Sequence, residues 1–85
     1  MGYDIIFTDE AEKNLDELDK KVAIRIIKKL KWFSLQDAPL SFASRLTYPA
    51  IGQYRFRTGD YRVIVDCRQE KIIVLRIGHR STIYR

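Results

Sequence analysis

The stretch from Tyr54 to Arg62 reads Tyr-Arg-Phe-Arg-Thr-Gly-Asp-Tyr-Arg, and it constrains the fold more than any other part of the chain. Aromatic and basic residues alternate before Thr58-Gly59-Asp60, and a second alternating segment begins after it. Alternation on both sides of a glycine-containing turn is the pattern of a β-hairpin. The sequence therefore predicts two antiparallel strands joined by a tight loop at Gly59-Asp60.

The arginines of this hairpin are expected on one face. Side chains along a strand alternate between two faces, so Arg55 and Arg57 point away from the face of Phe56. With a two-residue loop, Arg57 stands directly across from Arg62. Because like charges facing each other destabilise a sheet, this arrangement indicates a site for a polyanion rather than a structural device.

The chain of 85 residues predicts a single domain, 1–85, with a small core. Its 46% hydrophobic and 32% charged composition is that of a folded globular protein. No apolar run approaches the roughly 20 residues of a membrane span. The one cysteine, Cys67, excludes an internal disulfide, and no cysteine–histidine cluster has metal-ligand spacing. We therefore expect a cytoplasmic protein without metal, cofactor or membrane contact.

Positive charge is concentrated in the second half of the chain. Up to Ala43 there are seven basic and eight acidic residues, whereas from Ser44 onward there are nine basic and three acidic ones. Eight of those nine are arginines, whose planar guanidinium binds phosphate oxygens in pairs. A phosphate-rich partner, above all nucleic acid, is favoured over an ordinary solvated surface.

The first half predicts a strand followed by two helices. Tyr3 to Phe7 is a short strand candidate, and Thr8 is a good N-cap for a helix that ends near Lys20. After a break near Asp19, apolar residues recur every three or four positions and predict a second helix. That apolar stripe is Val22, Ile26, Leu30 and Phe33, with Ile27 beside it.

Three strands are expected in the second half, at about Gln53–Arg57, Tyr61–Asp66 and Lys71–Ile77, after an irregular stretch from Ser41 to Gly52. The predicted fold class is α+β. The N-terminal strand and a helical hairpin pack on one face of a small, twisted, mainly antiparallel sheet, and the other face is open and basic.

The alternation of apolar and polar residues in the last two predicted strands adds Arg76 to the face that carries Arg55, Arg57 and Arg62. Ile73, Leu75 and Ile77 form a purely apolar set, so we expect them to face the helices and Arg76 to face outward. In the middle strand the expected core set is Tyr61, Val63 and Val65, and the open set is Arg62, Ile64 and Asp66. Gly78 then lets the chain bend, which would bring the tail residues His79, Arg80 and Tyr84 to the arginines.

The segment Tyr54–Arg62, the strand pair after it and the ending Gly78-His79-Arg80-Ser81-x-x-Tyr84 together closely resemble the RelE-type toxins of the RelE/ParE toxin–antitoxin superfamily. The resemblance covers nearly the whole chain, including the helical hairpin. ParE-type toxins share the arginine hairpin pattern, whereas the tail motif is similar to RelE.

The resemblance implies a metal-independent endoribonuclease, an mRNA interferase, that inhibits translation by cutting mRNA in the ribosomal A site. The ribose 2′-OH attacks the phosphorus and leaves a 2′,3′-cyclic phosphate. Residues at the positions of Arg55, Arg57 and Arg62 hold the phosphate, Arg80 stabilises the leaving group, and Tyr84 orients or stacks the nucleotide. The implied partners are the ribosome, through 16S rRNA and mRNA, and an acidic RelB-like antitoxin.

Two departures from the family leave the proton acceptor open. Arg55 and Arg57 stand where some members have lysines, and arginine is a poor general base. His79 stands at a position that varies among members. His79, Tyr84 or a ribosomal group remain as alternatives. Arg76 is a further candidate phosphate contact, although it could instead pair with Asp66 or Glu70. Lys28 and Lys31 are candidate contacts to RNA on an otherwise solvated helix face.

Two other functions compete with the ribonuclease. One is a non-catalytic ParE-like toxin that binds and poisons DNA gyrase. The other is a plain nucleic-acid-binding or antitoxin-type module without chemistry. The combination of Arg80 and Tyr84 favours the ribonuclease, because a gyrase binder has no need of a tyrosine directed at a phosphate.

Overall fold

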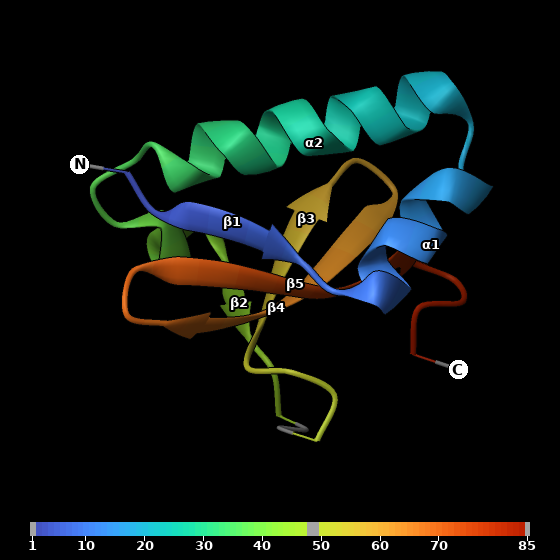
Figure 1. Ribbon diagram of the computed structural model, residues 1–85. Coiled ribbons are helices and arrows are strands. Elements are labelled where there is room, and N and C mark those ends of the chain that lie inside the picture. Colours follow the sequence, from blue (N-terminus) through green and yellow to red (C-terminus); the bar gives the residue numbers. More distant parts are fainter. Residues whose placement is uncertain (1, 48–49, 85) are drawn as a thin grey trace.

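A single sheet carries both helices of the protein on one of its faces (Figure 1). The computed structural model describes residues 2–47 and 50–84. Its elements are β1 (Asp4–Phe7), α1 (Asp9–Glu17), α2 (Lys20–Ser34), a 3₁₀ turn (Pro39–Phe42), β2 (Ser44–Arg45), β3 (Tyr54–Thr58), β4 (Tyr61–Arg68) and β5 (Lys71–His79). The strand order is β1-β5-β4-β3-β2, in which β1 is parallel to β5 and the other pairs are antiparallel. The predicted α+β fold is confirmed.

Both helices begin at side-chain caps. Thr8 Oγ1 accepts a hydrogen bond from the backbone N–H of Ala11 at 3.1 Å, and Asp19 accepts one from Lys21 at 2.9 Å. Each cap satisfies a backbone donor that the first helical turn leaves without a partner. The cap at Thr8 was predicted, and the break between the helices falls at Asp19 as expected.

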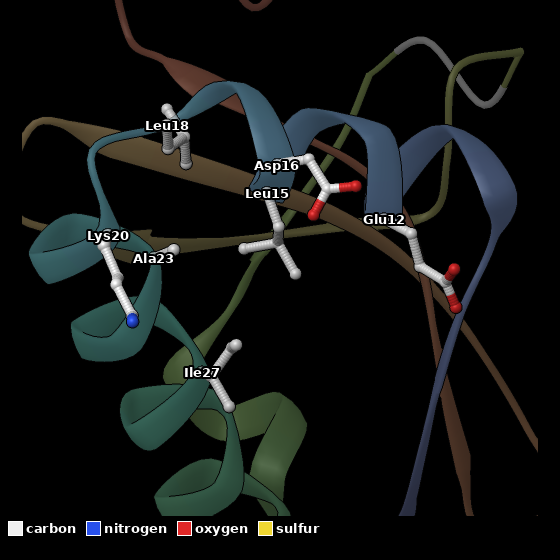
Figure 2. Close-up of a pocket in the computed structure, with 7 residues that line it drawn as sticks. All are labelled: Glu12, Leu15, Asp16, Leu18, Lys20, Ala23 and Ile27. Atoms are coloured by element: carbon white, nitrogen blue, oxygen red, sulfur yellow. The ribbon is translucent and has the colours of Figure 1, made fainter.

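The core lies between α2 and the sheet. Ile26, Leu30 and Phe33 of the predicted stripe are buried, and the ring of Phe33 stacks on that of Phe56 with centroids 4.5 Å apart. Ile27 is instead 42% exposed. It lies with Leu15 in a hollow between α1 and α2 (Figure 2). None of the described helices is long and apolar enough to cross a membrane.

The prediction for β5 was wrong in its first half. Ile72 and Val74 belong to the core, whereas Ile73 and Leu75 lie on the other face. The reason is a β-bulge, because Ile64 pairs with Arg76 while the next residue, Val65, pairs with Val74 and leaves Leu75 as the extra residue. Beyond the bulge the expected alternation returns, so Ile77 is buried in the core.

The face that carries no helix is only partly open. Ile64 is fully buried there because Gly52 lies on it, and a Cβ at Gly52 would stand 2.4 Å from Ile64 Cγ2. Gly52 has a φ of +149°, which few residues other than glycine adopt. The stretch Ser41–Gly52 was predicted to be irregular, but its described residues include a 3₁₀ turn and the short strand β2. That strand escaped prediction because two residues are too few for alternation to be visible.

Candidate functional site

The strand register gathers four arginines on the face opposite the helices. Arg57 pairs with Arg62, and Arg62 pairs with Gly78 on β5. In the neighbouring row Arg55 pairs with Ile64, which pairs with Arg76. Residues directly opposite one another in an antiparallel pair share a face. The predicted grouping is confirmed, and we call Arg55, Arg57, Arg62 and Arg76 the arginine face.

Arg62 lies buried at the centre of this face. Its side chain is 7% exposed, and Nη1 donates to the carbonyl oxygens of Gly59 at 2.9 Å and Tyr61 at 3.0 Å. No ion pair to Arg62 exists within the described residues. Burial lowers the pKa of Arg62, and the charges of Arg57, Arg55 and Arg80 lower it further. A buried cation beside like charges creates a strong demand for a bound anion.

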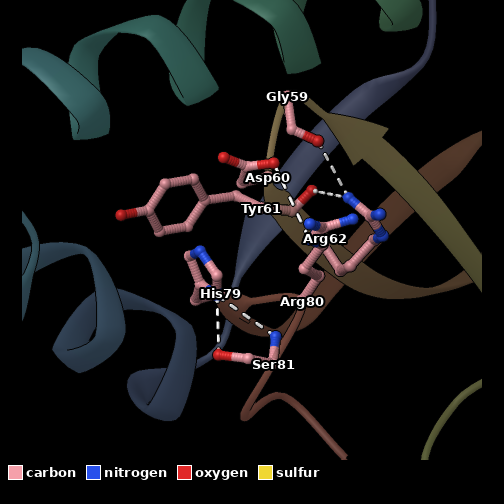
Figure 3. Close-up of polar contacts among 7 residues, drawn as sticks. All are labelled: Gly59, Asp60, Tyr61, Arg62, His79, Arg80 and Ser81. Carbon is pink, nitrogen blue, oxygen red and sulfur yellow. Dashed lines mark hydrogen bonds and ion pairs between the residues drawn. The ribbon is translucent and has the colours of Figure 1, made fainter.

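The tail residues 80–84 return over the sheet and are attached at the hairpin tip. The backbone N–H of Arg80 donates to the carbonyl oxygen of Asp60 at 2.7 Å, and Arg80 Nε lies 3.7 Å from Asp60 Oδ1 (Figure 3). Ile83, 4% exposed, anchors the tail against Gly78, where any Cβ would lie 2.9 Å from Ile83 Cδ1. Glycine at position 78 therefore allows the close approach that fixes the tail.

The far end of the tail is attached to the arginine face. Arg55 Nη1 donates a hydrogen bond to the phenol oxygen of Tyr84 at 2.9 Å. Tyr84 stays 47% exposed, so part of its surface is available to a ligand. The structure thus brings Arg80 and Tyr84 to the arginines, in agreement with the prediction for these two residues.

His79 does not join them, contrary to expectation. It pairs with Tyr61 across the strands and meets its ring edge-on at 5.5 Å, on the face that carries α1 (Figure 3). Nδ1 of His79 accepts the backbone N–H of Ser81 at 3.1 Å and lies 2.8 Å from Ser81 Oγ. Strand β5 continues through His79, so the chain bends only after this residue and its side chain stays on the helix side. His79 therefore stabilises the turn at the start of the tail instead.

The remaining candidate phosphate and RNA contacts, Arg76, Lys28 and Lys31, lie in different places. Arg76 is exposed at the edge of the arginine face, and neither Asp66 nor Glu70 forms an ion pair with it. Lys28 and Arg57 both line a groove under α2, whereas Lys31 is exposed and does not line that groove. No cluster of metal-ligating side chains occurs in residues 2–47 and 50–84.

Two contributors to the site were not predicted. Asp60 was considered only as a turn residue, although it holds Arg80 by two contacts. Ile83 was not considered, although an isolated apolar residue within the polar tail Arg80–Arg85 was a visible sign of an anchor. Both act through tertiary contacts that join the tail to the hairpin.

Residues 5–84 match the family described as the ParE toxin of the type II toxin–antitoxin system, parDE. The chain belongs to this family. It is accordingly a toxin of a type II toxin–antitoxin system within the RelE/ParE superfamily, as the sequence resemblance indicated.

Individual relatives agree with the family assignment. Toxin RelG of Mycobacterium tuberculosis is 28% identical over all of this chain and 99% of its own length. A chain of the RelBE2 toxin–antitoxin complex of M. tuberculosis superposes with a TM-score of 0.78 at 23% identity, covering 95% of this chain and 94% of that one. A chain of the archaeal RelE–RelB complex of Pyrococcus horikoshii gives a TM-score of 0.70 at 26% identity, covering 96% and 99%. This chain therefore shares its fold with a chain of each of these two complexes.

Proposed function

We propose that this family member is a metal-independent endoribonuclease that cuts mRNA in the ribosomal A site and thereby inhibits translation. The observation that carries the proposal is the hydrogen bond from Arg55 to Tyr84, which holds a half-exposed phenol beside the buried Arg62. A planar ring beside several guanidinium groups suits a nucleotide, because the ring can stack on a base while the cations bind its phosphate.

The chemistry is an in-line attack of the ribose 2′-OH on the adjacent phosphorus. The P–O5′ bond breaks, and the products are a 2′,3′-cyclic phosphate and a 5′-hydroxyl. Arg57 and Arg62 stabilise the negative charge that builds on the phosphoryl oxygens, and Arg80 stabilises the leaving O5′. Charges fixed before the substrate arrives are effective because they need little reorganisation during the reaction.

His79 lies on the opposite face of the sheet, which argues against it as the group that accepts the 2′-OH proton. Tyr84 and a ribosomal group remain for this role. The phenol oxygen of Tyr84 already accepts from Arg55, so its own proton points to another acceptor. That geometry supports a role for Tyr84 as the proton donor to the leaving O5′, and a ribosomal group is then the proposed acceptor of the 2′-OH proton.

The decisive experiment adds the purified protein to a translating extract and maps mRNA ends by primer extension. We expect cuts within the codon in the A site and cyclic phosphate termini on the upstream fragments. Naked mRNA without ribosomes should stay intact. Intact mRNA in an extract whose translation has stopped would contradict the proposal.

A second candidate is a ParE-like toxin that poisons DNA gyrase, which is favoured by the description of the matching family. A supercoiling assay with purified gyrase separates the two. Inhibited supercoiling together with intact mRNA would establish the gyrase poison, whereas active supercoiling together with A-site cuts would establish the ribonuclease.

An acidic, RelB-like antitoxin is the proposed partner, and the cytoplasm is the proposed location of both. The support is the net charge of +5 and the description of two similar structures, one as a toxin–antitoxin complex and the other as a RelE–RelB complex. A small acidic reading frame next to this gene, whose product copurifies with the toxin and restores growth, is the expected finding. Its absence would contradict the partnership.

A further inference from the structure

The tail begins as a single helical turn, and His79 stands at the position that caps it. The carbonyl oxygen of His79 accepts the backbone N–H of Ile83, four residues on, at 2.9 Å. Its ring Nδ1 accepts the backbone N–H of Ser81, two residues on, at 3.1 Å (Figure 3). A strand residue whose carbonyl begins a helical turn and whose side chain accepts from the second residue after it has the geometry of an N-cap. His79 therefore caps residues 80–84, which we call the tail turn.

This cap requires the neutral form of the ring. The backbone N–H of Ser81 can only donate, so Nδ1 must carry a lone pair and the ring proton must be on Nε2. The hydroxyl of Ser81 lies 2.8 Å from the same nitrogen and can donate to it as well. Protonation of Nδ1 would place one N–H donor against another. The usual N-caps, Ser, Thr, Asp and Asn, keep their acceptor oxygen near neutral pH, whereas histidine loses its acceptor there on gaining a proton.

The charged and titratable neighbours of the ring do not replace this cap. Tyr61 of β4 meets the ring edge-on at 5.5 Å, and Glu17 of α1 lines the same hollow as His79. Arg80 follows in the chain, and its Nε lies 3.7 Å from Asp60. Within the part of the chain that the structure describes, His79 forms no ion pair. The carboxylate of Glu17 attracts a protonated ring toward α1, which gives Ser81 no new acceptor.

The tail turn fixes the spacing between two contacts with the hairpin. At its start, the backbone N–H of Arg80 donates to the carbonyl oxygen of Asp60 at 2.7 Å. At its end, the phenol oxygen of Tyr84 accepts from Arg55 at 2.9 Å. An uncapped turn leaves more conformations open to the chain between these two points. Because cleavage depends on groups held in place before the substrate arrives, a looser tail lowers the rate.

We propose that His79 is a positioning residue for the ribonuclease site, which holds Arg80 and Tyr84 in place only while its ring is neutral, so that acidification reduces cleavage. The proposal rests on the proposed ribonuclease activity. The capped turn excludes a proton that the open turn accepts, so a lower pH favours the open turn. Cleavage is therefore highest above about pH 7.5 and declines toward about pH 5.5, across the range in which histidine gains its proton.

Two matched substitutions separate the cap from the ring. The side-chain oxygen of asparagine lies as many bonds from the backbone as Nδ1 does, and it does not gain a proton in this pH range. Glutamine carries the same amide one methylene farther out, where it does not match the N-cap geometry. On ribosomes programmed with mRNA at about pH 7.5, His79→Asn should cleave within about twofold of wild type, and His79→Gln at least about threefold more slowly.

The pH profile tests the titration. The ratio of cleavage by wild type to cleavage by His79→Asn cancels the pH dependence of the ribosome. We expect this ratio to fall at least about threefold between about pH 7.5 and about pH 5.5. A constant ratio would overturn the pH-sensitive cap. Equal losses in His79→Asn and His79→Gln at the higher pH would overturn the positioning role, because an amide that restores the cap would then restore nothing.

A measurement on the free protein keeps the test independent of activity. His79 is the single histidine, so its ring nitrogen signals in NMR report one titration. The backbone amide signal of Ser81 should follow that titration in wild type and stay constant in His79→Asn. A Ser81 signal that does not respond to ionisation of the ring would overturn the cap even if the protein cleaves mRNA. Intact mRNA at every pH would contradict the ribonuclease, while the Ser81 signal would still decide the cap.

Discussion

Arg55 and Tyr84, which are 29 positions apart in the sequence, meet through a 2.9 Å hydrogen bond from the guanidinium to the phenol oxygen. This contact joins β3 to the last described residue of the tail. It converts a partly buried arginine and an exposed tyrosine into one oriented pair beside Arg62. The proposed activity depends on this pair more than on any other contact.

Tyr84→Phe removes the hydrogen bond and keeps the ring. Because the bond is exposed, the free energy of unfolding should fall by less than about 1 kcal/mol. Ribosome-dependent cleavage should fall about a hundredfold or more, because the phenol proton is lost. Primer extension and urea unfolding measure the two effects. Full cleavage by the folded variant would exclude Tyr84 from the reaction.

Arg80→Ala should also reduce cleavage about a hundredfold, because one cation at the leaving oxygen is removed. Its ion pair with Asp60 is exposed, so unfolding should change by less than about 1 kcal/mol. Asp60→Asn keeps the backbone acceptor for Arg80 and should cause a smaller loss than Arg80→Ala. Lys13→Ala on the helix side serves as the control, and a loss there equal to that of Arg80→Ala would point to a nonspecific charge effect.

Arg62→Met tests the buried cation. The pKa of Arg62 is lowered by burial and by neighbouring arginines, so the charged form is less favourable in the folded state than in the unfolded chain. At neutral pH, where both states are protonated, removing the charge should leave stability unchanged or raise it by about 1 kcal/mol. Sulfate should raise the Tm of wild type more than that of the variant. Equal sulfate effects would show that the anion binds elsewhere.

Gly52→Ala should be strongly destabilising. Its Cβ would collide with Ile64, and φ is +149°, so we expect a loss of about 2 kcal/mol or more in urea unfolding. Gly59→Ala provides the comparison, because φ is +59° but no atom beyond the adjacent residues lies within 4 Å of the added Cβ. That variant should lose only about 1 kcal/mol. Equal losses would mean that backbone strain, and not the contact with Ile64, sets the cost.

Cys67 should react slowly. Burial raises the pKa of its thiol, so less thiolate is present at neutral pH than in a free cysteine. The alkylation rate should continue to rise with pH above about 8.5, the ordinary thiol pKa. Above that pH the unfolded chain loses this proton more readily than the folded one, so Cys67 lowers stability as pH rises. A rate that levels off near pH 8.5 would contradict the raised pKa.

Local patterns sufficed for much of the fold. The cap at Thr8, the break at Asp19 and the hairpin turn at Gly59-Asp60 each depend on a few neighbouring residues, and each was predicted. The bulge at Leu75 was not, because Ile73, Leu75 and Ile77 read as one continuous alternation. Arg76 was nevertheless placed on the correct face, since it lies on the side of the bulge where the expected alternation holds.

The sequence by itself determined which strands pair at the hairpin and that Arg55, Arg57 and Arg62 share a face, because a two-residue turn fixes the register on both sides of it. Only the tertiary structure decided which tail residues reach that face. Arg80 and Tyr84 meet the hairpin at Asp60 and Arg55, while His79 stays with Tyr61 on the helix side. The path of the tail depends on the contact of Ile83 with Gly78, and spacing along the chain does not encode such a packing contact.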